Sequence, residues 1–404
     1  MTTKPHIVVV ERHAEGHHPT YLAAILSALA DGGRRRVSTL LTPAAMEHPR
    51  VAASLTENGV LVRPLPPTPR RKKKGHPWLT WRYFNLKVFR MYAEGVRVLE
   101  QQAGPASMAF VPCLYDVEML GFGYTRFLFP WRTGGLYMNS APFRDALSGV
   151  PSKAKTGPTF LQDPRLACVG LLDEGIVPEV QAFAPRTVAG AVPDFAAIEP
   201  PVEPTGWPRI EAAARGKPIV GLFGYLKRSK GLLTFMQAAQ RLNARACFVA
   251  AGELPLGEYS ADEIHAIRAA DAHPESGFAL VEGRVESDGE FQELMRRATI
   301  ISCAYEGFLN SSNQVSLATL LGRPVVAPPT GCIADRVRKH GLGVVAESHG
   351  VAALTSAISQ ALDHPSTPPD PASATDAFSL KRFVGELSSL VERAITPQQR
   401  RRAA

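Results

Sequence analysis

Two stretches of this sequence share one pattern: a short apolar run, a loop that contains glycine, and a segment with apolar residues at helical spacing. The first stretch begins at residues 6–10 (HIVVV) and the second at residues 219–223 (IVGLF). Continuous apolar strands that alternate with helices of about ten residues are typical of parallel sheets covered by helices on both faces. Because the pattern starts twice, the sequence predicts an α/β protein with two doubly wound domains.

Prolines mark the boundary between the two predicted domains. Five prolines fall within residues 193–208, and proline is excluded from helix interiors and central strands. The length of 404 residues also fits two to three domains of roughly 150 residues each. We therefore expect an N-terminal domain over 1–195, a linker over 196–217, a C-terminal domain over 218–375 and a terminal helical segment over 376–404.

The composition excludes several other classes of protein. Hydrophobic residues make up 45% of the chain and charged residues 20%, which is typical of a folded domain and not of a disordered chain. No apolar run is long enough to span a membrane, and the N-terminus lacks the pattern of a secretory signal. The five cysteines are widely spaced and indicate neither a disulfide framework nor a zinc site. We expect a cytoplasmic protein without a bound metal.

Positive charge is concentrated in the first half of the chain. Residues 1–195 contain 23 Lys and Arg against 15 Asp and Glu, whereas residues 196–404 contain equal numbers of basic and acidic residues. The densest run is Arg70, Arg71, Lys72, Lys73 and Lys74, and the aromatic residues Trp78 and Trp81 follow it. Such a run is typical either of a solvated loop or of a segment that contacts an anionic membrane surface or acceptor. No signature of a nucleic-acid-binding fold accompanies it.

The loop after residues 219–223 is short, basic and bounded by Gly224 and Gly231. Lys227, Arg228 and Lys230 could neutralise a phosphate, and the start of the next helix would add its dipole. The loop lacks the Walker pattern of nucleotide triphosphatases. A solvated basic turn is the alternative interpretation.

A second polar loop follows the predicted strand 299–303. Ligands of open α/β sheets bind at the carboxyl ends of strands, which is where this loop lies. Glu306 could accept hydrogen bonds from sugar hydroxyls, and Ser311, Ser312 and Asn313 could hold an oxyanion at a helix start. The alternative is a surface acid followed by ordinary N-cap residues.

The loop after the first strand contains Gly16, His17 and His18. A histidine at the end of a strand could bind or deprotonate an acceptor, although histidines in such loops often have a structural role. We place Asp116 with these residues on the acceptor side.

Several segments in the second half of the sequence resemble family-4 glycosyltransferases with the GT-B fold. The resemblance covers residues 215–350 well, whereas the first half of the chain shares only the general order of strands and helices. The segments that carry it are 223–226 (FGYL), 230–231 (KG), 250–253 (AAGE), 282–285 (EGRV), 306–308 (EGF), 322–327 (GRPVVA), 330–333 (TGCI) and 341–343 (GLG).

The resemblance implies two Rossmann-like domains that face a central cleft, with the C-terminal helix packed back on the N-terminal domain. It implies transfer of a hexosyl group from a nucleotide diphosphate sugar, UDP-linked in preference to GDP-linked, with retention and without a metal or other cofactor. Glu306, Lys230 and His17 are the catalytic candidates. The donor-binding candidates are Gly224, Tyr225, Lys227, Arg228, Lys230, Gly252, Gly283, Arg284, Val285, Glu306, Gly307, Phe308, Ser311, Ser312 and Asn313.

The sequence departs from the family pattern at two places. Tyr225 occupies the position of the phosphate-loop arginine. The family's second glutamate, which holds the ribose, is also missing. Counting forward from Glu306 places Gln314 at its position, whereas aligning back from Gly322 places Leu317 there.

Three alternatives to a retaining transferase stay open: an inverting transferase with a histidine base, a non-catalytic scaffold or partner subunit of the same fold, and a nucleotide-sugar epimerase. The acceptor would be a sugar, a lipid-linked molecule or a small molecule of glycan, glycolipid, polysaccharide or natural-product biosynthesis.

Overall fold

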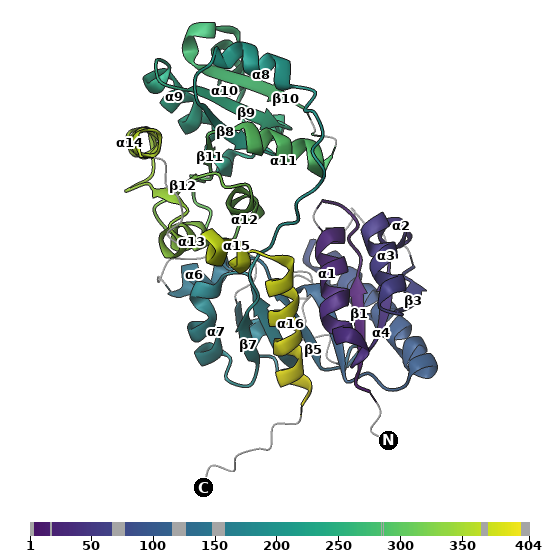
Figure 1. The fold of residues 1–404 in the computed structure, drawn as a ribbon. Coiled ribbons are helices and arrows are strands. Elements are labelled where there is room, and N and C mark those ends of the chain that lie inside the picture. The colour runs from purple at the N-terminus through teal and green to yellow at the C-terminus, as the bar shows by residue number, and fades with distance from the viewer. Residues whose placement is uncertain are drawn as a thin grey trace. The chain divides into compact units, whose positions relative to one another are not determined.

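The chain divides into two compact units, each built on one parallel sheet (Figure 1). Unit 1 comprises Met1–Pro193 and Leu380–Ala404, and unit 2 comprises Asp194–Ser379. The computed structural model describes residues 4–16, 18–66, 77–114, 127–147, 158–283, 285, 287–364 and 371–396. Four sets of predicted site residues lie outside these ranges: His17, the basic run Arg70–Lys74, Asp116 and Arg284.

Unit 1 has a sheet of seven strands whose neighbours are all parallel. In spatial order the strands are β3 (Leu61–Pro64), β2 (Arg36–Leu41), β1 (His6–Glu11), β4 (Met108–Cys113), β5 (Thr133–Tyr137), β6 (Leu166–Leu171) and β7 (Val188–Ala191). The helices are α1 (His18–Ala30), α2 (Pro43–Glu47), α3 (Pro49–Glu57), α4 (Pro77–Ala103), α6 (Ala141–Leu147), α7 (Val177–Phe183) and α16 (Leu380–Ile395). Strands β1 and β6 are buried along their whole length, as expected for central strands covered on both faces.

The last helix, α16, packs on unit 1 beside α1, β6 and β7 (Figure 1). Phe383 is fully buried and meets Tyr21 of α1 edge to face, with 5.6 Å between the ring centroids. Arg35, also buried, donates to the Glu392 carboxylate and to the Ser388 carbonyl. The chain therefore returns to its first unit after completing the second.

Unit 2 has a second parallel sheet, of six strands. In spatial order they are β10 (Phe278–Glu282), β9 (Cys247–Gly252), β8 (Ile219–Phe223), β11 (Ile300–Ser302), β12 (Val325–Ala327) and β13 (Gly343–Val345). The helices are α8 (Trp207–Ala214), α9 (Leu232–Leu242), α10 (Ala261–Ala272), α11 (Asp288–Arg297), α12 (Asn313–Leu320), α13 (Cys332–His340), α14 (Val351–Asp363) and α15 (Pro371–Ala377). One apolar core joins the sheet to its helices.

The predicted linker 196–217 differs from the structure, because it contains helix α8 and belongs to unit 2. Pro208 lies in the first turn of α8, where a missing backbone N–H breaks no helical hydrogen bond. Ile210 and Ala214 are buried in the core of unit 2. The prolines thus mark the edge of a domain and the start of a helix, and not a free tether. None of the helices in the described ranges is both long and apolar enough to cross a bilayer.

Candidate active site

Strands β8 and β11 lie side by side in the middle of the unit 2 sheet, although 76 residues of sequence lie between the end of β8 and the start of β11. The chain runs from β8 outward through β9 and β10, and then returns to the other side of β8 to form β11. The loops that follow β8 and β11 therefore diverge at a topological switch point, which is where open α/β sheets bind ligands. These are the two loops that the sequence predicted to bind the donor.

Three glycines end the neighbouring strands β8, β9 and β10. The Gly224 N–H donates to the Ala251 carbonyl and the Gly283 N–H to the Gly252 carbonyl, so the strand ends stay joined beyond the sheet. At Gly252, where φ is +148°, a Cβ atom would lie 2.0 Å from the Gly224 carbonyl oxygen. Only glycine permits this approach of two backbones.

We expect Gly252→Ala to lower the free energy of unfolding by about 2–4 kcal/mol, from backbone strain together with the overlap on Gly224. Gly283→Ala is the matched control, since its φ is +142° but a Cβ atom there would have no neighbouring atom within 4 Å. The control variant should lower the free energy of unfolding only by the backbone strain, about 1 kcal/mol. Urea unfolding of both variants measures the difference, and equal costs would contradict the steric explanation.

Lys230 lies at the end of the loop after β8, with its side chain turned back toward the sheet. Its ammonium donates to the Phe223 carbonyl and lies 5.6 Å from the centroid of the Tyr305 ring. Burial lowers the pKa of Lys230 to about 8, and the nearby Lys227 acts in the same direction. A partly desolvated ammonium interacts strongly with an anion, so Lys230 suits the phosphate-binding role predicted for it.

The other basic residues of this loop have different surroundings. Arg228 is exposed and forms an ion pair with Glu263, and its backbone N–H donates to Glu258 over 2.9 Å. Lys227 is exposed and lies 5.5 Å from the centroid of the exposed Tyr225 ring. Arg228 therefore has a carboxylate partner from α10, whereas Lys227 is open to solvent.

Glu306, in the loop after β11, lies against the start of helix α9. Its carboxylate accepts a hydrogen bond from Thr234, and its N–H donates to the Ser229 carbonyl over 2.7 Å. Gly231, which lies next to the Glu306 carboxylate, has a φ of +73° that favours glycine. The carboxylate therefore lies beside the partial positive charge of a helix start. Thr234 was not predicted from the sequence, since nothing local distinguishes it from other helical threonines.

Glu306 also borders a narrow recess at the carboxyl edge of the sheet. Pro328 and Pro329 from the loop after β12, and His349 and Gly350 from the loop after β13, form its other walls. The half-buried carboxylate thus lies beside loops from several strand ends.

The three polar residues at the start of α12 differ in their partners. The Ser311 hydroxyl bonds to the Asp194 carboxylate and to the Arg336 guanidinium, each at 2.6 Å. Asp194 and Arg336 are both buried, 3.9 Å apart, and neither was predicted from the sequence. Ser312 caps α12, and Asn313 is the first residue of the helix. Ser311 therefore anchors the loop, and only Ser312 and Asn313 occupy the predicted position at the open helix start.

The structure distinguishes the two alignments of the missing second glutamate. Gln314 lies at the site: its Nε2 donates to the Phe223 carbonyl over 2.8 Å, and its Oε1 accepts from the Tyr305 hydroxyl over 3.0 Å. Leu317 is buried in the core of unit 2. Gln314, and not Leu317, therefore contacts the strand end and the loop that were predicted to bind the donor.

The remaining predicted donor residues lie at the carboxyl edge of the unit 2 sheet. Gly307 is exposed with φ +60°, Phe308 packs edge to face on Tyr305 with 5.5 Å between ring centroids, and Val285 follows the end of β10.

Gly16 and His18, two of the residues predicted for the acceptor side, lie in the loop after β1, at the switch point of the unit 1 sheet. The buried Glu11 accepts a hydrogen bond from the His13 N–H over 2.7 Å, and its other oxygen lies 3.7 Å from Nδ1 of His18. The His13 and His18 rings lie 4.7 Å apart, and Gly16 turns the loop with φ +61°. Sequence reasoning missed Glu11 because it ends an otherwise apolar strand. Within the described ranges, no group of three His, Cys, Asp or Glu side chains could hold a metal ion.

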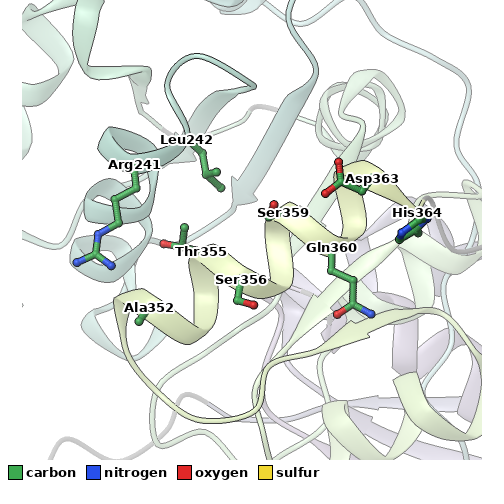
Figure 2. Close-up of a pocket in the computed structure, with 9 residues that line it drawn as sticks. All are labelled: Arg241, Leu242, Ala352, Thr355, Ser356, Ser359, Gln360, Asp363 and His364. Carbon is green, nitrogen blue, oxygen red and sulfur yellow. The ribbon is translucent and has the colours of Figure 1, made fainter.

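A separate groove of about 580 Å³ lies between α9 and α14 (Figure 2). Arg241 and Leu242 come from the last turn of α9. The other lining residues lie along α14 to its C-cap: Ala352, Thr355, Ser356, Ser359, Gln360, Asp363 and His364. Both helices follow parallel strands, so their ends return to the amino edge of the sheet. This groove holds none of the predicted donor residues.

Residues 217–364 match the family model described as glycosyl transferases group 1. This range lies within unit 2 and contains every predicted donor-binding residue. The resemblance to glycosyltransferases is therefore confirmed for this part of the chain. No curated protein matches the chain by sequence.

Solved structures share the fold over nearly the whole chain. A glycosyltransferase from Rickettsia africae is 12% identical, with 98% of this chain and 100% of that chain covered and a TM-score of 0.63. Anabaena HepE in complex with UDP and glucose is 13% identical, with 96% and 100% covered and a TM-score of 0.61. Sucrose-phosphate synthase from Thermosynechococcus elongatus is 16% identical, with 97% and 96% covered and a TM-score of 0.58. The fold is thus that of GT-B glycosyltransferase structures, as predicted.

Proposed function

We propose that this protein transfers a hexosyl group from a nucleoside diphosphate sugar to an acceptor, and that unit 2 binds the donor. The observation that carries the proposal is the pair of loops at the β8–β11 switch point, with Lys230 in one and Glu306 in the other. Both loops lie within the range that matches glycosyl transferases group 1. The similar fold of HepE, whose structures contain UDP and UDP-glucose, supports UDP in preference to GDP.

The chemistry requires stabilisation of a departing diphosphate and of positive charge at the anomeric carbon. Groups that are already oriented toward the developing charge supply most of such stabilisation. Lys230 would bind the diphosphate, and Glu306 would hold hydroxyls of the transferred sugar. We propose retention of configuration, in which the leaving phosphate takes the acceptor proton and no protein base is needed.

Lys230→Ala is expected to weaken UDP binding by about 1.5–3 kcal/mol, the contribution of a hydrogen bond to a charged group. Because the pKa of Lys230 is lowered to about 8, the wild-type protein should also lose UDP affinity as the pH rises from 7 to 9. Lys230→Arg should bind UDP with little change over this window, since arginine stays charged. Calorimetry at three pH values measures both effects. Unchanged affinity in Lys230→Ala would contradict the assigned role.

We also propose that transfer needs no metal ion, because Lys230 and the helix start at Ser312 and Asn313 supply positive charge to the diphosphate. Turnover should be unchanged after chelation with EDTA. A loss of activity that Mg²⁺ or Mn²⁺ restores would contradict this.

Inversion with a histidine base is the second candidate, and the contact between Glu11 and His18 favours it. A buried carboxylate beside an imidazole can orient the ring for general-base catalysis. The anomeric configuration of the product, measured by NMR, distinguishes the two mechanisms. An inverted product that disappears in His18→Ala would establish the second.

We propose a lipid-linked or anionic acceptor at a membrane surface, on the basis of the positive charge in residues 1–195. Five cations at about 1 kcal/mol each would contribute at most roughly 5 kcal/mol to binding, and salt would screen most of it. The protein should therefore sediment with anionic vesicles at low salt and be released at high salt. No binding at low salt would favour a small-molecule acceptor in solution.

A screen of nucleotide sugars by thermal shift, followed by a transfer assay with the best donor, tests the function as a whole. UDP-sugars should raise the unfolding temperature and yield a glycosylated product. Donor binding without hydrolysis or transfer would instead support the non-catalytic scaffold.

A further inference from the structure

The Phe223 carbonyl, at the end of β8, accepts hydrogen bonds from two side chains of the donor site. One donor is the Lys230 ammonium, and the other is Nε2 of Gln314 at 2.8 Å. The Tyr305 hydroxyl donates to Oε1 of Gln314 and so fixes which end of the amide faces Phe223. Burial raises the pKa of the Tyr305 phenol well above its usual value, which keeps this donor protonated.

The same two nitrogens lie close together over Gly224. A Cβ atom on Gly224 would lie 3.1 Å from Nζ of Lys230 and 3.2 Å from Nε2 of Gln314. Both distances are tighter than ordinary contacts, so glycine avoids crowding the two groups, and it also adopts the φ of +83° that the turn requires. An ammonium has three N–H donors and a primary amide has two. After each gives one to Phe223, both nitrogens retain N–H groups for a further acceptor.

This pair of donors also carries a net positive charge. Lys230 forms no ion pair with any residue that the structure describes, and Gln314 is neutral. An acceptor that matches two neighbouring N–H donors and a positive charge, at a strand end that continues into a glycine, is a phosphate oxygen.

We propose that Gln314 is a diphosphate-binding residue, which together with Lys230 donates hydrogen bonds to the donor's phosphate oxygens over Gly224. The assignment rests on the proposed function and gives Gln314 a role other than the ribose contact expected of a glutamate at its position. A glutamate here could not donate to Phe223, would repel the diphosphate, and would pair with the Lys230 ammonium.

The test compares Gln314→Glu and Gln314→Met with the wild-type protein by calorimetry, using UDP and uridine. Gln314→Met should bind UDP about tenfold more weakly, as expected for the loss of one hydrogen bond to a charged group. Gln314→Glu should lose more affinity than Gln314→Met, because it adds a negative charge. Uridine, which lacks phosphate, should bind all three proteins equally.

The pH dependence gives a second readout. A carboxylate at position 314 would raise the pKa of Lys230, so the loss of UDP affinity with rising pH should move to higher pH in Gln314→Glu.

A Gln314→Glu variant that binds UDP as tightly as the wild type, or more tightly, would overturn the assignment and support a ribose contact. Wild-type protein that binds no nucleoside diphosphate would instead overturn the proposed function itself. If Gln314→Glu does not fold, Gln314→Met decides, and its unchanged UDP affinity would overturn the assignment.

Discussion

Glu306→Ala is expected to lower the rate of sugar transfer by about 100-fold or more, while UDP affinity changes less than about threefold. The reason is that the carboxylate is proposed to hold the transferred sugar, and contacts that strengthen in the transition state affect turnover more than ground-state binding. The position supports this role, since Thr234 and the Ser229 carbonyl fix Glu306 beside a recess at the carboxyl edge of the sheet. Steady-state kinetics and UDP calorimetry measure the two quantities.

Glu275→Ala is the matched control for this change. It removes the same charge from unit 2, but the side chain is exposed and precedes β10, at the opposite edge of the sheet. We expect transfer and UDP affinity of the control to match those of the wild type. A fall of UDP affinity in Glu306→Ala as large as the fall in turnover would place Glu306 in the nucleotide site.

Arg336→Met is expected to lower the free energy of unfolding by about 3–5 kcal/mol, the cost of breaking a buried charge pair. Arg336 is almost fully buried, donates to Ser311, lies 3.9 Å from the Asp194 carboxylate and stacks over Phe378 at 5.5 Å. Removing the guanidinium leaves the Asp194 carboxylate buried without this cation. Urea unfolding measures the loss.

Two further variants identify the cause. Asp194→Asn combined with Arg336→Met should recover a large part of the lost stability, because the buried charge is removed as well. Arg338→Met, on the same helix α13, removes an exposed guanidinium and should cost less than about 1 kcal/mol. A double variant no more stable than Arg336→Met would contradict the charge-pair explanation.

Local patterns predicted most of the architecture of unit 2. The apolar runs predicted at 219–223 and 299–303 contain strands β8 and β11, whose residues are buried in a parallel sheet. The prediction was less accurate at 196–217, where the helix signal of α8 is short and surrounded by prolines. That segment is a packed helix because Ile210 is buried in the core of unit 2. The residues of this core are distant in the sequence, so the local pattern does not reveal the packing.

The sequence by itself determined that the loops containing Lys230 and Glu306 lie side by side. In parallel sheets the loops after strands meet at the carboxyl edge, so Lys230 and Glu306 could be placed together from the order of strands and helices alone. Only the tertiary structure decided which partners those loops have. It joins Asp194 to Ser311 across 117 positions, pairs Arg228 with Glu263 and brings Gln314, not Leu317, to the Phe223 carbonyl. The physical reason is that strand and helix periodicity acts over neighbouring residues, whereas side-chain pairing depends on distances that exist only after the sheet and its helices have packed.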